Sequence, residues 1–327
     1  MPDTTDLFAR RNRLRIAAIV VLATLNYMLA VALGAVAVVL GLLLLAIFDF
    51  DVLFEIIGSG LGTLKIIGIV LAGIIVISFV VGLLVAICKI PFARRRLERQ
   101  VLRETGATIA KGDEHREVRN ILEALAIPAD VDVPRFAVIT DPAPNSFGVG
   151  TQPSKSIVGV TTGLSDVLSR DELEAVLAYE VSRVQSWDVA LSSWTVALTS
   201  GAISAVDGGD GEILKSLLGW LPRRLGESLQ VWALRDQGKE RDKAAVRFTR
   251  NPGSLVRALE KLDADQQQVG RVTRSTAPLW IEFPKRALGG SGSRATRRLA
   301  NELLLDERIA DLRTLAALPP EEPAAKA

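Results

Sequence analysis

Two long uncharged stretches constrain this chain more than any other feature. No charged residue occurs from Ile16 to Phe48 or from Ile66 to Cys88. About 20 apolar residues in a helix cross the hydrocarbon core of a bilayer, and buried core helices are rarely so long. The mean hydropathy of the whole chain, +0.29, fits this interpretation. We therefore predict transmembrane helices at 16–48 and 66–88.

A cleaved signal peptide is the alternative for the first stretch. Basic residues precede it, and small residues at Ala35 and Ala37 have the spacing of a cleavage site. The apolar run continues beyond those positions, which indicates an uncleaved anchor.

Basic residues predict how these helices are oriented. Arginines precede the first stretch and follow the second, whereas the connection carries three acidic residues and no basic residue before Lys65. The positive-inside rule then predicts a hairpin with both ends in the cytoplasm. We expect a multi-pass protein of the cytoplasmic (inner) membrane, with the bilayer as one partner and its C-terminal domain in the cytoplasm.

Charge and cysteine content exclude several other classes. The formal net charge is only +2, so the basic clusters are topology signals and we expect no nucleic-acid partner. Cys88 is the single cysteine, which excludes an intramolecular disulfide and a cysteine-rich zinc site.

The rest of the chain predicts a small sheet followed by helices. Short apolar segments separated by turn residues predict strands at 135–140, 146–149 and 156–161. Helical patterns occur at 91–108, 114–125, 170–188, 235–250, 254–262 and 297–312. The predicted fold class is α+β: an N-terminal transmembrane helical hairpin, then a mainly helical domain with a small β-sheet.

We divide the chain into a basic cytoplasmic N-terminus (1–15), a transmembrane hairpin (16–89), a cytoplasmic domain (90–314) and a disordered tail (315–327). Val189–Val206 is also uncharged but rich in serine and threonine. A third span would need a fourth to return the chain, so we favour a buried or membrane-surface helix there.

The helix at 170–188 has the frame of a metal site without its ligands. Ser169 and Glu172 predict a capping box at its start. Zinc peptidases with an HExxH motif place two histidines at i and i+4 on such a helix, with a glutamate beside the first. Here these positions are Tyr179 and Arg183, and Glu180 remains. The one histidine, His115, lies among charged residues and is expected to be solvated.

Several stretches resemble the HtpX-like membrane-bound zinc metalloproteases, relatives of the CAAX proteases. The resemblance rests on Asp141–Phe147, Ile157–Leu164, the lead Arg170–Ala178 and Asp188. It implies a zincin-like (gluzincin) fold for the domain, a zinc cofactor and peptidase activity. By the same resemblance, Glu180 stands at the position of the general base.

The resemblance also implies that the zinc ligands are replaced. Tyr179 and Arg183 stand at the two histidine positions. Counting back from Thr249–Pro252 places the third ligand, a glutamate in the family, at Gly238, and a family aspartate at Asp242. With one histidine and one cysteine in the chain, we predict no zinc and expect Glu180 to be non-functional as a base.

We therefore predict a pseudopeptidase that binds protein or peptide clients in membrane protein quality control. The family offers a strand edge to extended substrates, and the strand at 157–161 or its neighbour could still do so. Two alternatives stay open: an active metalloendopeptidase with atypical ligands, and a structural membrane protein. We also predict that Arg183 bridges Glu180 and Asp242 in place of the metal, the alternative being an ordinary solvated helix pair.

Overall fold

A computed structural model describes residues 4–48, 61–111, 115–207, 224–225, 228–234, 238–265, 267–273, 276–282 and 305–317. The chain forms two compact units. One unit comprises residues 1–19, 94–197 and 228–327, and the other comprises residues 20–93 and 198–227. The predicted tail beyond residue 317 lies outside the described residues. The same holds for two further expectations from the sequence, a flexible glycine-rich loop at 289–293 and a segment at 217–221 that lies against the bilayer.

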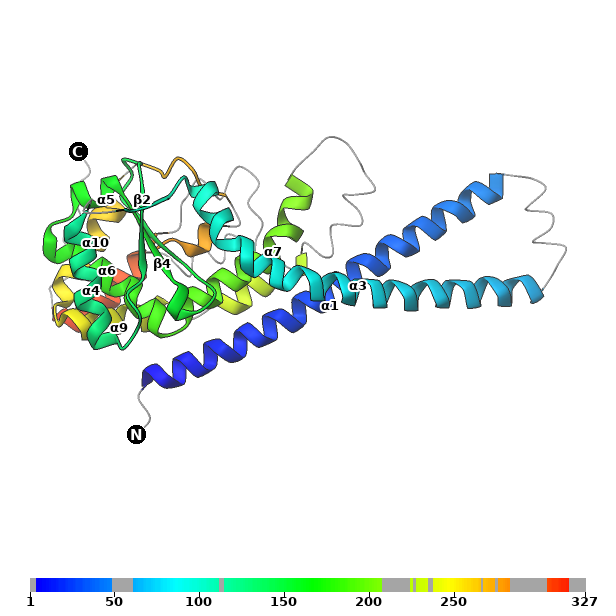
Figure 1. Ribbon diagram of the computed structural model, residues 1–327, viewed down its shortest axis with the longest axis horizontal. Coiled ribbons are helices and arrows are strands. Elements are labelled where there is room, and N and C mark those ends of the chain that lie inside the picture. The colour runs from blue at the N-terminus through cyan, green and yellow to red at the C-terminus, as the bar shows by residue number, and fades with distance from the viewer. Residues whose placement is uncertain are drawn as a thin grey trace. The chain divides into compact units, whose positions relative to one another are not determined.

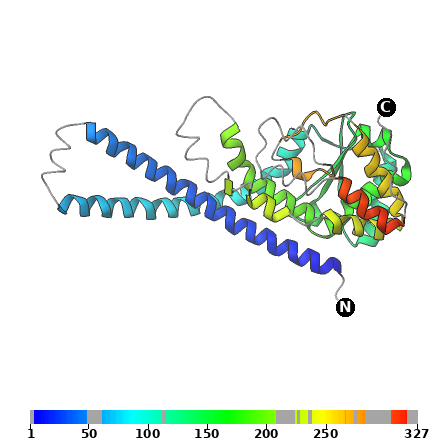
Figure 2. The ribbon, with the colours of Figure 1, turned by 180° about the vertical axis from the view of Figure 1, so that it is seen from behind.

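Two long helices cover both predicted spans. Helix α1 runs over Thr4–Phe48 and α3 over Leu61–Thr105, and Figures 1 and 2 show them crossing. They approach closely at Gly82, where an added Cβ would lie 2.7 Å from the Cα of Met28. Glycine allows this approach because it has no side chain.

Parts of these two helices are apolar and exposed. Among the described residues, one helix segment is long and apolar enough to cross a bilayer, Asp6–Val36, and only 18% of its most apolar window is buried. Among the described side chains of α3, the apolar segment is Ala72–Leu84, which is shorter than a span. Large apolar side chains on α3 are nevertheless exposed, among them Ile77 and Leu84. Asp6–Val36 is thus one candidate span by length and composition, while the second span and the hairpin topology stay predictions.

A four-stranded sheet has the order β1-β2-β4-β3. The strands are β1 (Thr108–Ile109), β2 (Arg135–Ile139), β3 (Ser146–Val149) and β4 (Ile157–Thr161). β2 and β4 are parallel, and the other two pairs are antiparallel. The three predicted strands are confirmed, and β1 is an additional edge strand.

Alternation along the strands gives the sheet two buried faces. In β2, Phe136 contributes to one core cluster and Ala137 and Ile139 to the other, as expected when successive side chains point to opposite faces. Helices α4 (Arg116–Ala129), α6 (Arg170–Gln185), α10 (Pro252–Ala264) and α12 (Leu305–Ala316) pack in the first cluster. Figure 1 shows α4, α6 and α10 grouped beside the sheet, together with α9 (Gly238–Thr249).

The central helix begins and ends for identifiable reasons. The Ser169 side chain accepts from the Glu172 N–H, and Glu172 Oε2 accepts from the Ser169 N–H at 2.8 Å, so the predicted capping box is confirmed. The helix ends at Gln185 rather than 188, because Trp187 takes a left-handed conformation with φ 62°. Asp188 then begins α7 (Asp188–Asp207).

The uncharged segment 189–206 lies within α7. In its first half Val189, Leu191 and Val196 are buried, as are the polar side chains of Ser193 and Thr195. The prediction of a buried helix is therefore met for residues 189–197. His115 is exposed at the start of α4, as predicted.

Candidate functional site

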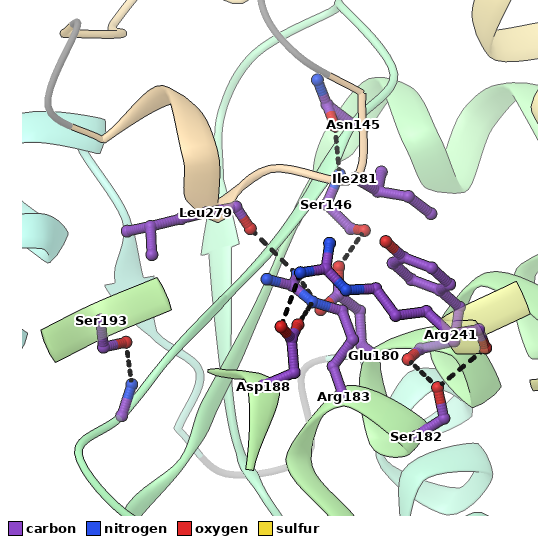
Figure 3. Close-up of polar contacts among 12 residues, drawn as sticks. Asn145, Ser146, Glu180, Ser182, Arg183, Asp188, Ser193, Arg241, Leu279 and Ile281 are labelled. Atoms are coloured by element: carbon purple, nitrogen blue, oxygen red, sulfur yellow. Dashed lines mark hydrogen bonds and ion pairs between the residues drawn. The ribbon is translucent and has the colours of Figure 1, made fainter. Parts of the chain in front are cut away.

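Helix α6 places a carboxylate and a guanidinium one turn apart in the interior of the domain. Arg183 Nη1 donates to Glu180 Oε2 at 2.9 Å, and neither side chain has any solvent exposure. Figure 3 shows Arg183 lying between Glu180 and Asp188. The alternative of an ordinary solvated helix pair is therefore wrong, and the expected contact between Arg183 and Glu180 is confirmed.

A second carboxylate and a second guanidinium complete the cluster. Arg183 Nε donates to Asp188 Oδ2 at 2.8 Å, and Arg241 Nη2 of α9 donates to Asp188 Oδ1 at 2.6 Å. We call Glu180, Arg183, Asp188 and Arg241 the central ion cluster. Its formal charges cancel, which is the condition under which buried charges are tolerated.

The predicted bridge from Arg183 to Asp242 is wrong. Arg308 of α12 binds Asp242 through two parallel bonds, Nε–Oδ2 at 2.9 Å and Nη2–Oδ1 at 2.7 Å. Successive residues of a helix point about 100° apart, so Arg241 of α9 faces Asp188 while Asp242 faces α12. Helices α6 and α9 are instead linked through Asp188, which accepts from Arg183 and Arg241, and α9 is linked to α12 through Asp242 and Arg308.

Of the remaining predicted positions, Tyr179 lies beside this cluster and Gly238 begins helix α9. Tyr179 is buried, and its ring centroid lies 4.9 Å from Arg308 Cζ and 5.8 Å from Arg183 Cζ. Both distances are within the range of cation–π attraction. Gly238 is the first residue of α9, the helix whose Arg241 carbonyl accepts from Ser182 Oγ of α6 at 3.3 Å.

Both oxygens of Glu180 are bound to protein groups. Oε2 faces Arg183, and Oε1 accepts from Ser146 Oγ of β3 at 2.8 Å. Gly148 of β3 leaves room for this carboxylate, because a Cβ there would lie 3.0 Å from Glu180 Oε2 and 2.8 Å from Val189 Cγ2. The strand and the helix are thus fitted to each other around the carboxylate.

The pKa values of the two acids of the cluster are shifted in opposite directions. Burial raises the pKa of Glu180, because desolvation outweighs the single Arg183 charge and the hydrogen bonds from Ser146 and Arg183. Burial would also raise the pKa of Asp188, but the charges of Arg241 and Arg183 hold that pKa below its ordinary value. Asp188 is therefore the acid that the cluster stabilises in its charged form.

The outer edge of the sheet beside the cluster is occupied by the chain itself. Trp280 forms an antiparallel bridge with Phe147, and the Ile281 N–H donates to the Ser146 carbonyl at 2.9 Å. The two rings lie 5.2 Å apart. Beyond them, the Asn145 side chain accepts from the Glu282 N–H at 3.3 Å and donates to its carbonyl at 3.1 Å. We call residues 277–282, which include the short 3₁₀ turn η2 (Ala277–Leu279), the edge segment.

Two arginines hold the edge segment in place. Arg183 Nη1 donates to the Leu279 carbonyl and Arg308 Nη1 to the Ile281 carbonyl, both at 3.0 Å. Figure 3 shows the first of these bonds. Arg183 and Arg308, whose guanidiniums contact the Tyr179 ring, therefore also hold the edge segment in place.

The edge segment corrects the expectation of a free strand edge. β4 lies between β2 and β3 and has no free edge, and β3 is paired with Trp280 and Ile281. Leu279, Trp280 and Ile281 are almost fully buried. At about 1.5–3 kcal/mol for each side chain, removing all three from the core would cost about 5–9 kcal/mol. That is comparable with the stability of a whole domain.

The side chains gathered here do not fit the zinc ion that the resemblance implies. Zinc is bound by histidine, cysteinate or carboxylate groups, whereas a guanidinium has only donors and a permanent positive charge. Within the part of the chain that the structure describes, no three His, Cys, Asp or Glu side chains gather as metal ligands. The cluster can fix helices and a strand, and it holds its carboxylates in protein hydrogen bonds.

Sequence reasoning missed several members of this site. Asp188 and Ser146 belong to the stretches that carry the family resemblance but have no predicted role in the site, and Arg241, Arg308 and the edge segment carry no recognised signal. The local cue for Asp188 is its position five residues after Arg183, just beyond the end of α6. Arg308 lies 66 residues from Asp242, so no local spacing could have joined them.

Comparison with known proteins adds the family context. Residues 112–313 match the family described as "Peptidase family M48". A "Protease HtpX homolog" of Dictyoglomus turgidum is 28% identical over 255 residues, covering 73% of this chain and 82% of the relative. Another, from Streptococcus gordonii, is 31% identical over 240 residues, covering 66% of this chain and 80% of the relative.

Proposed function

This chain belongs to peptidase family M48 and is an HtpX-like member of it, and from that premise we propose that it is a membrane-anchored pseudopeptidase. In this proposal the domain binds protein clients without cutting them and takes part in membrane protein quality control. The scaffold of the family is kept, and the metal chemistry is lost.

One observation carries the proposal: the guanidinium of Arg183, at a family ligand position, is buried against Glu180. Hydrolysis by a zinc peptidase needs a metal-held water and a carboxylate free to take its proton. Here Glu180 Oε1 and Oε2 are engaged by Ser146 and Arg183. A positive side chain in this place also repels any cation by simple electrostatics.

Membrane attachment is the second part of the proposal. Its support is the apolar segment Asp6–Val36, the exposed apolar side chains of α3, and the arginines that flank both uncharged stretches. We propose a two-span hairpin with the domain on the cytoplasmic side. The bilayer is then a permanent partner.

Binding by strand addition at β3 is not the recognition mode that we propose. An incoming peptide would have to displace the edge segment together with its bonds to Arg183, Arg308 and Asn145. The displacement cost of about 5–9 kcal/mol would consume most of the roughly 8 kcal/mol that a micromolar complex provides. Client binding must use another surface.

The competing function, an active peptidase with atypical ligands, is separated by a cleavage assay. The full chain in detergent is incubated with casein, beside a Glu180→Gln variant and an active HtpX-type protease. We expect no cleavage above the Glu180→Gln background. Cleavage by the wild type that disappears in Glu180→Gln would reject the pseudopeptidase.

A further inference from the structure

A groove lies at the surface of the domain, away from the central ion cluster. It has a volume of about 580 Å³, within the range of about 300–1,000 Å³ typical of ligand sites. Its walls are the last turns of α4, the connection from α4 into β2, the 3₁₀ turn η1 (Pro153–Lys155) and Trp187. None of these residues belongs to the central ion cluster.

Two large apolar side chains that line the groove are exposed to solvent. Ile127 is 82% exposed and Val133 is 49% exposed, and both line the groove. Isoleucine and valine are among the residue types most often buried. Two of them exposed together in a concave site provide an anchoring surface for an apolar side chain.

Acidic side chains surround this apolar surface. Glu123, Asp130 and Asp132 line the groove and are exposed. None of the three forms a salt bridge with any residue that the structure describes. Three uncompensated carboxylates around one groove favour a positively charged ligand.

A guanidinium of the chain already contacts Trp187, one of the residues that line the groove. Arg13, an exposed residue near the start of α1, lies with its Cζ 5.5 Å from the Trp187 ring centroid. The Asn12 side chain donates to the Ser186 carbonyl at 2.8 Å and fixes this contact. A tryptophan face is the best aromatic partner for a cation, so Trp187 is chemically suited to contact an arginine or a lysine.

We propose that this groove binds a short segment of a partner protein in which an apolar side chain is flanked by lysines or arginines. Segments of this composition adjoin transmembrane helices on the cytoplasmic side, so the partner class is the basic juxtamembrane segment of another membrane protein. The proposal rests on the proposed function, because it names what the non-catalytic domain binds.

The test measures peptide affinity with the full chain in uncharged maltoside micelles. A fluorescein-labelled peptide of about 12 residues carries one leucine flanked by lysines and arginines, and a control peptide has glutamates in their place. Fluorescence anisotropy gives each Kd after subtraction of binding to empty micelles. We expect the basic peptide to bind at least tenfold more tightly, with the preference shrinking at high salt because exposed charges are screened.

Two matched triple variants locate the site, and each removes three exposed carboxylates. The groove variant combines Glu123→Gln, Asp130→Asn and Asp132→Asn. The control variant combines Asp166→Asn, Asp263→Asn and Glu307→Gln. Asparagine suits the left-handed conformation of residue 130, where φ is 50°, so the groove variant should fold.

The expected result is at least a tenfold rise in Kd for the groove variant and less than a twofold rise for the control variant. Ile127→Ser should also weaken binding severalfold without lowering the melting temperature, since this side chain is exposed. Equal affinity of the two triple variants, equal affinity for the two peptides, or no binding of the basic peptide would each overturn the proposal that the groove binds a basic segment.

The two proposals, peptide binding in the groove and loss of peptidase activity, can fail independently of each other. Casein cleavage that depends on Glu180 would reject the pseudopeptidase whatever the groove binds. If the chain does not cleave casein and the groove variant binds the peptide as tightly as the wild type does, only the proposed binding in the groove is refuted.

Discussion

Replacing Arg183 by methionine should destabilise the domain severely. The substitution keeps much of the side-chain volume but removes three bonds, to Glu180, Asp188 and the Leu279 carbonyl. Asp188 would keep Arg241, whereas Glu180 would keep only the Ser146 hydroxyl. A buried carboxylate would then have no positive partner.

The magnitude follows from that burial. Breaking a buried ion pair from one side typically costs about 3–5 kcal/mol, because the remaining charge stays desolvated. In a domain of roughly 150–250 residues, each kcal/mol lowers the melting temperature by about 2–4 °C. Arg183→Met should therefore lower it by about 6–20 °C. Adding Glu180→Gln should recover part of the loss, since the two residues are directly coupled.

The assay is thermal unfolding of the full chain in maltoside detergent, followed by tryptophan fluorescence at one heating rate. The matched control is Arg135→Met. Arg135 forms an equally short pair with Glu98, at 2.7 Å, but the two side chains are 48% and 34% exposed. Exposed pairs contribute about 0–1 kcal/mol, so this variant should lose less than about 4 °C. An Arg183→Met loss as small as that of the control would refute the buried cluster.

Three further predictions use the same unfolding assay. Because the pKa of Glu180 is raised in the folded state, its contribution to stability is largest below the ordinary value of about 4.3 and falls as the pH rises toward the folded pKa. The stability of Glu180→Gln relative to the wild type should therefore increase between pH 4.5 and pH 7.5. A stability difference between the two proteins that stays constant over this range would contradict the raised pKa. Trp280→Ala should cost about 3–5 kcal/mol, since the indole is buried against Phe147; a loss below about 1 kcal/mol would mean that the edge segment detaches readily. Ser169→Ala should cost about 1 kcal/mol through loss of the capping box, and an unchanged melting temperature would show that the cap contributes nothing.

Elements with local signals could be predicted from the sequence. The strands at 135–139, 146–149 and 157–161 stand out through apolar residues bounded by turns, and α6 through its capping box. The two-residue strand β1 has no periodicity that could reveal it. The edge segment was equally hidden, since it begins as a 3₁₀ turn and pairs with β3 through a single bridge.

The partners in the ion cluster could not be predicted, because they depend on how helices face each other. The contact between Glu180 and Arg183 follows from their i, i+3 spacing on one helix. The choice between Arg241 and Asp242 as the residue of α9 that faces α6 does not, because a rotation of about 100° exchanges them. Asp242 is satisfied by Arg308 from a helix near the C-terminus, a long-range packing effect that neighbouring sequence does not contain.

The central claim is that this chain keeps the scaffold of an M48 peptidase without its metal chemistry. The most direct test is the zinc content of the full chain, purified in detergent without a histidine tag and measured by mass spectrometry beside an active HtpX-type protease. We expect about one zinc per chain in the active protease and less than about 0.1 in this chain. About one zinc per chain here, lost in a variant of a residue near Glu180, would contradict the claim.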